Sequence, residues 1–167
     1  MKRGAIVLAS LASLGVNYLA DRLTKLLALR YLTEGERLSF LGDTVVITLA
    51  SNAGAFLSMG AQWPPALKYA LLLVFPLIAC AYGVYYILVK ETKLTRAVLL
   101  GAVIGGGFGN LIDRLLNDFH VVDFLNFGIG RLRTGVLNVA DLSVTFGAIA
   151  LIVYEYAEDK RKGALSR

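Results

Sequence analysis

Four aspartates stand within or beside long apolar stretches of the sequence, where ionised side chains are rare. They are Asp21, Asp113, Asp123 and Asp141. A carboxylate is costly to place in hydrocarbon, so an acid in such a position tends to mark function. Each falls near the same end of a predicted helix or in the loop that feeds it. We therefore expect the four carboxyl groups to converge at one membrane depth.

Asp123 and Asp141 are the pair with the clearest chemical potential, because neither has a cation next to it in the sequence. Asp123 lies between Val122 and Phe124, and Asp141 lies about one turn inside an apolar helix. Two such carboxyls can share a proton, so that one acts as base and the other as acid. This arrangement would activate a water molecule for peptide hydrolysis. The alternative for Asp141 is a structural role, in which it caps its helix or forms hydrogen bonds within a bundle.

Three groups of polar side chains follow helical spacing in the same segments. They are Asn17, Asp21 and Lys25 with Thr24 beside them, then Asn110, Asp113 and Arg114, and then Asn138 with Asp141. Residues spaced by three or four lie on one face of a helix. In the first group, an internal Asp–Lys ion pair explains the pattern as well as a functional role does. In the second, Asp113 and Arg114 either pair with each other or orient a neighbour.

Other catalytic chemistries find few residues in this sequence. His120 is the only histidine, so a zinc site of the His/Cys type lacks ligands, and a Ser-His protease would depend on this one residue. A Ser-Lys arrangement, such as Ser58 with Lys25 or Lys68, has no local motif but stays open. We accordingly expect neither a metal ion nor another cofactor.

A stripe of glycines crosses one apolar segment, where Gly101, Gly105 and Gly109 recur at intervals of four. Such small residues let neighbouring helix backbones approach closely in a membrane. A phosphate-binding glycine loop is the alternative, but the run lies inside a predicted membrane helix and lacks the P-loop lysine. The stripe therefore predicts helix packing.

The composition indicates that these segments lie in a membrane. Of 167 residues, 57% are hydrophobic and 17% are charged, whereas a soluble domain carries about 25% charged residues. Four segments are long enough to cross about 30 Å of hydrocarbon, which takes roughly 20 helical residues. They run over residues 4–28, 66–89, 95–113 and 136–157. We expect a single membrane domain over residues 1–167, with the first segment kept as a span rather than cleaved as a signal peptide.

The basic residues predict the orientation, because they cluster in the N-terminal tail, the 90–96 loop and the C-terminal tail. By the positive-inside rule, both termini and this loop face the cytoplasm, which leaves residues 30–65 and 114–135 outside. Each outer segment contains a β-prone stretch, at 43–50 and at 119–125. The chain is thus predicted to form a four-helix transmembrane bundle that carries a small extracytoplasmic sheet. No basic and aromatic patch for nucleic acid is present.

Seven other acidic residues fall in loops or at the cytoplasmic boundary, and we expect solvent to surround all of them. They are Glu34, Glu36, Asp43, Glu91, Glu155, Glu158 and Asp159. The polar residues inside the spans gather at one face of the membrane only. This argues against a transporter, whose polar side chains would line a path across the bilayer.

These residues together make the chain resemble the lipoprotein signal peptidase family (signal peptidase II), which are bacterial membrane aspartic proteases. The resemblance rests on five motifs in the family's order. They are Asp21-Arg-Leu-Thr-Lys25, Asn52-Ala-Gly-Ala-Phe56, Gly105-Gly-Gly-Phe-Gly-Asn-Leu-Ile-Asp-Arg114, Val121-Val-Asp-Phe124 and Asn138-Val-Ala-Asp141. Each motif alone is weak, but together they cover nearly the whole chain and are highly specific.

The resemblance implies a membrane all-α four-helix bundle with a small extracytoplasmic β-cradle and a second outer loop or helix segment. It implies an intramembrane aspartic endopeptidase that removes the signal peptide from prolipoproteins, cleaving N-terminal to a diacylglyceryl-modified cysteine. Asp123 and Asp141 match the catalytic pair that activates water. The positions that would bind substrate or support the site are Asp21, Lys25, Asn52, Gly54, Asn110, Asp113, Arg114 and Asn138.

The resemblance also implies a monomer in the bacterial cytoplasmic (inner) membrane, with its active site near the outer face. Its partners would be the lipid-modified prolipoprotein and membrane lipids, and the cyclic peptide globomycin would inhibit it. Two positions depart from the family's pattern: Arg22 stands where Gln is usual, and Leu137 stands where an aromatic is usual. Arg22 would alter the charge near the lipid headgroups, and Leu137 would alter the packing beside Asn138.

Overall fold

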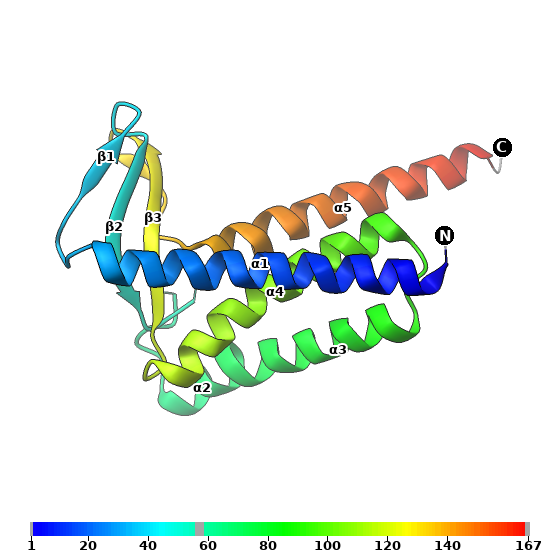
Figure 1. Ribbon diagram of the computed structural model, residues 1–167, viewed down its shortest axis with the longest axis horizontal. Coiled ribbons are helices and arrows are strands. Elements are labelled where there is room, and N and C mark those ends of the chain that lie inside the picture. Colours follow the sequence, from blue (N-terminus) through cyan, green and yellow to red (C-terminus); the bar gives the residue numbers. More distant parts are fainter. Residues whose placement is uncertain (1, 56–58, 166–167) are drawn as a thin grey trace.

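Helix α4 (Leu94–Leu116) is the element on which the other membrane helices assemble. It packs against α1 (Arg3–Tyr31), α3 (Phe75–Val89) and α5 (Val139–Leu165). Figure 1 shows α3 and α5 on either side of α4, with the start of α1 and the end of α5 at the same end of the bundle. A small sheet lies at the opposite end.

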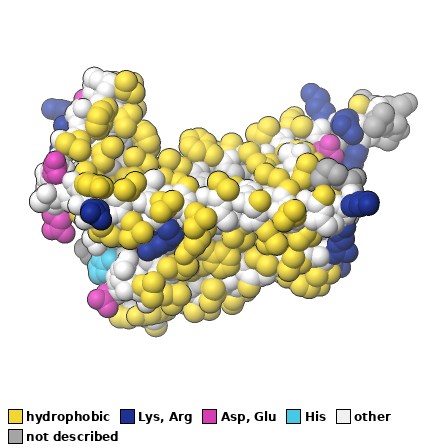
Figure 2. All heavy atoms as spheres, viewed as in Figure 1, with side chains coloured by type: hydrophobic (Ala, Val, Ile, Leu, Met, Phe, Trp, Pro, Cys, Tyr) yellow, Lys and Arg dark blue, Asp and Glu magenta, His cyan; other side chains and the backbone are white. Residues whose placement is uncertain are grey.

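The computed structural model describes residues 2–55 and 59–165, and four helices in these ranges are long and apolar enough to cross a membrane. They are Arg3–Tyr31, Pro65–Val89, Leu94–Leu116 and Val139–Ala164. The four predicted spans fall on these helices. Large apolar side chains stay exposed along them, such as Leu8 at 69%, and Figure 2 shows apolar atoms over most of the visible side of the bundle. A surface of this kind is suited to lipid rather than to water.

Helix α5 begins later than the sequence predicts, because residues 136–138 are not helical. Leu137 instead exchanges backbone hydrogen bonds with Leu125 in the sheet. Asn138 then caps the helix, since its Oδ1 accepts the N–H of Asp141 at 2.9 Å. An asparagine in this position satisfies one of the free N–H groups at a helix start.

A proline explains the irregular second membrane helix. This helix is one run of α2 (Pro65–Tyr69), a π-helical segment η2 (Ala70–Val74) and α3. Pro76 has no N–H, and in a regular helix its ring would collide with the carbonyl four residues earlier. The wider turn, marked by the bond from the Phe75 N–H to the Ala70 carbonyl, accommodates it. The helix therefore continues through the proline.

Both outer segments contribute strands to one antiparallel sheet, which stands across the end of the bundle (Figure 1). The strands, in their order in the sheet, are β1 (Leu38–Phe40), β2 (Val45–Asn52), β3 (Val121–Ile129) and β4 (Leu132–Arg133). The stretches predicted as β-prone, 43–50 and 119–125, become β2 and β3 and pair with each other. A small sheet on a four-helix membrane bundle is thereby confirmed. The second outer segment has no helix beyond the end of α4 and supplies β3 and β4 instead.

The pairing of β2 with β3 brings polar residues of two distant segments together. Ala50 lies opposite Asp123, and Asn52 lies opposite Val121. A bulge shifts the register between Ile47 and Ala50. A bulge bends its strand and re-aims the side chains beyond it. The end of β2 thus runs past Asp123, so that Asn52 reaches it.

The glycine stripe lets α1 lie directly on α4. A methyl group added at Gly101 would lie 2.3 Å from the Ser10 carbonyl oxygen, and one added at Gly105 would lie 2.4 Å from that of Leu14. No side chain larger than hydrogen fits at such distances. The packing role predicted for the stripe is confirmed.

One acidic residue that was expected in solvent is buried at the end of the bundle opposite the sheet. Glu91, between α3 and α4, accepts the N–H groups of Thr92 and Lys93 at 2.7 Å and Nε of Arg96 at 2.6 Å. Burial alone would raise the pKa of Glu91, but these hydrogen bonds outweigh it and lower the pKa. Arg96 also pairs with Glu155 at 3.2 Å, which fastens the loop to α5. The expectation of a solvated Glu91 is wrong because its own loop folds back over the carboxylate.

Replacing Gly105 by alanine should force α1 away from α4 and lower the free energy of unfolding by about 1–3 kcal/mol, the usual cost of extra volume in a packed contact. Chemical or thermal unfolding in detergent micelles measures this change. Gly15→Ala is the matched control, because Gly15 is also helical and an added methyl group meets nothing within 4 Å. It should leave stability unchanged or slightly increased. Equal effects of the two substitutions would contradict the packing role.

Candidate active site

Asp123, on β3, is a buried carboxylate held by two asparagine amides. The residue is 1% exposed. Asn138 Nδ2 donates to Oδ1 at 2.6 Å, and Asn52 Nδ2 donates to Oδ2 at 2.9 Å. The Asn52 amide is itself oriented, because its Oδ1 accepts the Gly54 N–H at 2.9 Å. Both carboxyl oxygens of Asp123 are therefore held in fixed directions.

The environment of Asp123 favours its protonated form more than water does. Burial raises the pKa of Asp123 to about 6, and the neighbouring charge of Asp141 acts in the same direction. The amide donors of Asn52 and Asn138 favour the ionised form but do not cancel the effect of burial. A carboxyl with a pKa near 6 exchanges its proton close to neutral pH, which suits a general acid or base.

Asp141, in the first turn of α5, takes part in capping its own helix. Its Oδ2 accepts the Asn138 N–H at 3.2 Å, while Asn138 Oδ1 accepts the Asp141 N–H at 2.9 Å. This reciprocal pattern satisfies two free donors at a helix start. Its Oδ1 accepts Asn110 Nδ2 at 2.9 Å. The structural role considered for Asp141 from the sequence is therefore present.

Asp141 also faces a cavity of about 460 Å³, so capping is not its only contact. The lining combines Asp141, Thr134 and Thr145 with the apolar side chains of Phe127 and Leu137, among others. A few polar groups within an apolar cavity are typical of a ligand site. Asp141 thus borders a cavity whose walls are almost entirely apolar.

Asn138 joins the two aspartates. It is fully buried, and its Nδ2 donates to Asp123 Oδ1 and, at 3.0 Å, to Asn110 Oδ1. Its backbone N–H and its Oδ1 both bond to Asp141. One side chain therefore fixes the placement of Asp123 relative to Asp141.

Lys25, on α1, is a buried cation at the centre of a charge cluster. Its Nζ lies 2.7 Å from Asp21 Oδ2, 2.8 Å from Asp113 Oδ2 and 2.9 Å from Asn110 Oδ1. An ammonium group has donors only, so it bonds the amide oxygen of Asn110 and leaves the NH₂ group for Asp141. The internal Asp21–Lys25 pair considered from the sequence is present as part of this larger network.

The two acids of the cluster also bond the elements that carry the aspartate pair. Asp21 Oδ1 accepts the N–H of Ala140 on α5 at 2.9 Å. Asp113 Oδ2 accepts the N–H of Val122 on β3 at 3.2 Å. Each of these donors belongs to the residue just before one member of the aspartate pair. The cluster therefore positions α5 and β3 as well as balancing charge.

Two arginines differ from what the sequence indicated. Arg22 pairs with Asp113, so its charge is compensated inside the protein instead of acting at the lipid headgroups. Arg114 forms no ion pair with Asp113, and the local pair considered for these two is wrong. It donates instead to the Gly54 carbonyl at 2.8 Å, which corresponds to the other alternative, that it orients a neighbour.

His120 and Lys68, which the sequence offered for other catalytic chemistries, form their bonds outside the network around the two aspartates. His120 is exposed, and its Nδ1 lies 2.8 Å from the Asp118 carbonyl oxygen. Lys68 donates to the Ala61 carbonyl at 3.2 Å, and Ser58 lies outside the described residues. In the part of the chain that the structure describes, no three His, Cys, Asp or Glu side chains form a group that could hold a metal ion.

All of the site residues predicted from the sequence lie in one connected hydrogen-bond network. Sequence reasoning missed the role of Arg22, whose partner lies 91 positions away on another helix. It also missed the cavity lining by Phe127 and Thr134, which comes from the sheet. The available signal was a basic residue next to a predicted polar stripe in an apolar helix. No spacing pattern in the sequence identifies Asp113 as the partner of Arg22.

The Asp123 carboxyl should titrate near pH 6, and Asp141→Asn should lower its pKa, because the substitution removes a nearby negative charge and leaves the burial. Carbon-13 NMR of labelled aspartate carboxyls follows both titrations. Because this pKa lies above the ordinary 3.8, the stability that Asp123 contributes is complete below that value and is lost as the pH rises through about 6. An unchanged pKa of Asp123 in Asp141→Asn would contradict coupling of the two carboxyls.

Lys25→Met should destabilise the protein by about 3–5 kcal/mol, because it leaves Asp21 and Asp113 as buried charges without their shared cation. Chemical unfolding in detergent gives the free energy. Arg22→Gln is the comparison, since Arg22 also pairs with Asp113 but its side chain is 23% exposed, and its loss should matter less. If Lys25→Met were as stable as the unsubstituted protein, the cluster would not be held by charge.

Comparison with known proteins relates this site to a family. The family model described as signal peptidase (SPase) II matches residues 14–157, which include every site residue named above. The chain is 38% identical over 146 residues to the lipoprotein signal peptidase of Borrelia hermsii (strain HS1 / DAH), covering 84% of this chain and 85% of the relative. It is 38% identical over 138 residues to that of Mycobacterium leprae (strain Br4923), covering 80% of this chain and 64% of the relative.

Solved structures show the same fold. A bacterial membrane enzyme with 24% sequence identity superposes with a TM-score of 0.79 and covers 92% of this chain and 90% of its own. A second such structure, also 24% identical, gives a TM-score of 0.73 and covers 87% of this chain and 90% of its own. With a family model that spans most of its length and relatives at this identity, the chain belongs to the signal peptidase II family.

Proposed function

We propose that this protein is an aspartic endopeptidase that removes the signal peptide from prolipoproteins. It cleaves on the N-terminal side of a cysteine that carries diacylglycerol, and Asp123 and Asp141 activate the attacking water. The observation that carries the proposal is the pair of carboxyl groups held by Asn138, one buried and one facing a cavity. The family match supports lipoprotein processing as the activity.

The mechanism divides acid and base work between the two aspartates. The deprotonated aspartate takes a proton from water as the water oxygen bonds to the scissile carbonyl carbon. The protonated aspartate polarises the carbonyl oxygen and then gives its proton to the leaving nitrogen as the C–N bond breaks. The pKa of Asp123, about 6, suits proton exchange of this kind. The leaving amine is that of the lipid-modified cysteine.

Arg114 is placed to bind the substrate backbone. Its guanidinium already bonds the Gly54 carbonyl, and its Nε is buried without a hydrogen-bond partner among the described residues. An unpaired buried donor is costly, so a substrate carbonyl would satisfy it. The amides of Asn52, Asn110 and Asn138 hold the aspartates without help from substrate, which keeps the site preorganised.

The proposed reaction consumes only water and substrate, with no metal ion and no other cofactor. The proposed active form is a monomer. The partners are the diacylglyceryl prolipoprotein and the surrounding lipid, with globomycin-type peptides as inhibitors and no nucleic acid.

The proposed location is the bacterial cytoplasmic (inner) membrane, with both termini in the cytoplasm and the site near the outer face. Basic side chains gather at the end of the bundle where α1 begins and α5 ends (Figure 2). The positive-inside rule assigns such an end to the cytoplasm. The sheet, with Asp123, lies at the other end. A substrate anchored in the outer leaflet by its acyl chains would meet the site without leaving the membrane.

Asp123→Asn and Asp141→Asn should each abolish cleavage of a diacylglyceryl prolipoprotein, because each leaves the reaction without its base or its acid. Purified protein is incubated with the synthetic lipid-modified substrate, and the released signal peptide is quantified by mass spectrometry. Globomycin should inhibit the unsubstituted protein, and EDTA should have no effect.

Asp118→Asn is the control, because Asp118 is an exposed aspartate near the sheet and outside the hydrogen-bond network of the site. It should retain full activity. Full activity in either Asp123→Asn or Asp141→Asn would remove the aspartate pair from the mechanism. Loss of activity in EDTA would point to a metal ion. Equal cleavage of a prolipoprotein without diacylglycerol would contradict the proposed substrate.

A further inference from the structure

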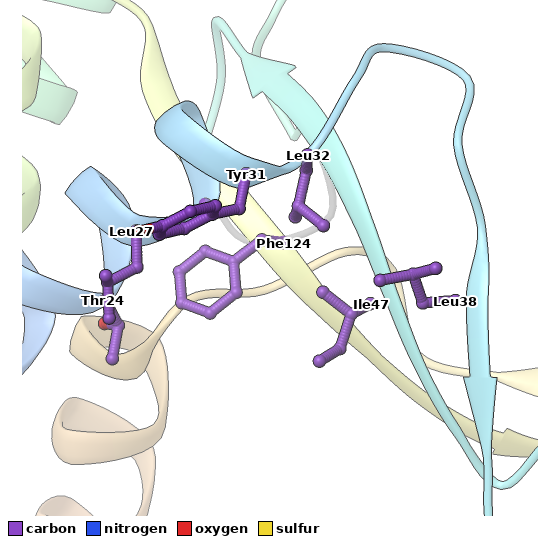
Figure 3. Close-up of a pocket in the computed structure, with 8 residues that line it drawn as sticks. Thr24, Leu27, Tyr31, Leu32, Leu38, Ile47 and Phe124 are labelled. Atoms are coloured by element: carbon purple, nitrogen blue, oxygen red, sulfur yellow. The ribbon is translucent and has the colours of Figure 1, made fainter.

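A second cavity, of about 260 Å³, lies between the end of α1 and the sheet. Figure 3 shows Leu27 and Tyr31 of α1 near Phe124 of β3, with Leu38 and Ile47 on the neighbouring strands. No polar atom of the described residues is exposed to it. The cavity is therefore apolar on all of its described sides.

The one hydroxyl-bearing aliphatic residue of the lining does not change this character. The Thr24 hydroxyl donates to the Ala20 carbonyl of its own helix at 2.7 Å, so Thr24 offers the cavity its methyl group. A peptide placed here would find no partners for its N–H and C=O groups, and a charged headgroup would find no counterion. The ligand that fits this lining is a hydrocarbon chain.

The cavity adjoins the proposed active site. Phe124, which lines it, directly follows Asp123 in β3. Ile47, which also lines it, pairs with Leu125, and Leu125 is two residues from Asp123. The lining therefore lies next to Asp123 along β3 and across the pair of β2 with β3.

We propose that this cavity binds one acyl chain of the diacylglyceryl group on the substrate cysteine. The inference rests on the proposed function, which supplies a lipid-modified cysteine a few bonds from the scissile peptide bond. The lining residue Phe124 directly follows Asp123, so a chain held here lies beside the proposed catalytic carboxyl. The cavity offers such a chain apolar surface only.

The cavity is open from the side on which α1 meets the surrounding lipid. Leu27 is 53% exposed and Tyr31 is 69% exposed, so an acyl chain can enter laterally. A chain that moves from lipid into an apolar cavity exchanges one hydrocarbon environment for another and gains little free energy. The proposed contribution of the cavity is to position the substrate. An acyl chain bound there holds the cysteine, and with it the scissile bond, next to the carboxyl groups.

Filling the cavity should impair cleavage only for substrates whose acyl chains are long enough to enter it. Leu27→Trp adds bulk at the lining, and Leu26→Trp is the matched control, because Leu26 is 54% exposed on the same helix and does not line the cavity. With dipalmitoyl substrate, Leu27→Trp should lower kcat/KM about tenfold relative to Leu26→Trp, within the range that misplacing a substrate costs. With diacetyl substrate the two variants should be equal. Equal losses on both substrates would overturn the inference.

Binding itself is measured by tryptophan quenching in an Asp141→Asn protein. Trp63→Phe removes the only tryptophan of the sequence, and Tyr31→Trp or Leu26→Trp then supplies a single reporter. A diacylglyceryl-cysteine peptide with brominated acyl chains should quench the Tyr31→Trp protein more strongly than the Leu26→Trp protein. A brominated phospholipid at the same concentration should quench both alike. Equal quenching of both by the peptide, or preferential quenching of Tyr31→Trp by the phospholipid, would overturn the inference.

The two measurements separate this inference from the proposed function. Quenching reports the seated chain whether or not a bond is cleaved, so failure of the aspartate mechanism would leave it measurable. Conversely, cleavage that keeps the same dependence on acyl length in Leu27→Trp and in Leu26→Trp would retain the peptidase and overturn the acyl site.

Discussion

The buried ammonium group of Lys25 is the constraint on which the arrangement of the site depends. It bonds oxygen atoms of Asp21, Asp113 and Asn110, which lie on two helices. Charges removed from water are tolerated only when their partners are present and aligned, so α1 and α4 cannot shift past each other without leaving a charge unpaired. The same ammonium fixes the Asn110 amide, whose NH₂ group then holds Asp141. Through Asn110, the buried Lys25 on α1 thereby helps to fix the Asp141 carboxyl on α5.

In this bundle, close packing of the helices and burial of charged groups depend on the same contacts. A methyl group at Gly109 would lie 2.3 Å from Asp21 Oδ2, so the stripe that lets α1 and α4 touch also makes room for a buried carboxylate. Lipid is as apolar as the helix surfaces, and apolar burial therefore contributes little to the association of membrane helices. Close backbone contact and paired charges take its place. The elements that hold the helices together are, for this reason, the same ones that support the aspartate pair.

The membrane helices and most of the site could be predicted from the sequence because hydropathy and helical spacing are local properties. Asp21 and Lys25 lie one turn apart, and Asn138 caps the helix whose first turn holds Asp141, so each pair is visible in a short window. The partners of Arg22 and Glu91 were not predictable in this way, since the first lies on another helix and the second is bonded by the backbone of its own loop. Hydropathy also placed the start of α5 too early. It registers apolar residues but not the strand-like bonds of Leu137.

Helices α4 and α5 are fastened to each other at both of their ends. Near the sheet the link is Asn110 with Asp141, and at the far end it is Arg96 with Glu155 and Lys93 with Glu158. Sliding or separation of the two helices would therefore break side-chain bonds at both ends. By contrast, the outermost strand β1 pairs only with β2 among the described strands, so this edge of the sheet can shift without breaking any bond between α4 and α5.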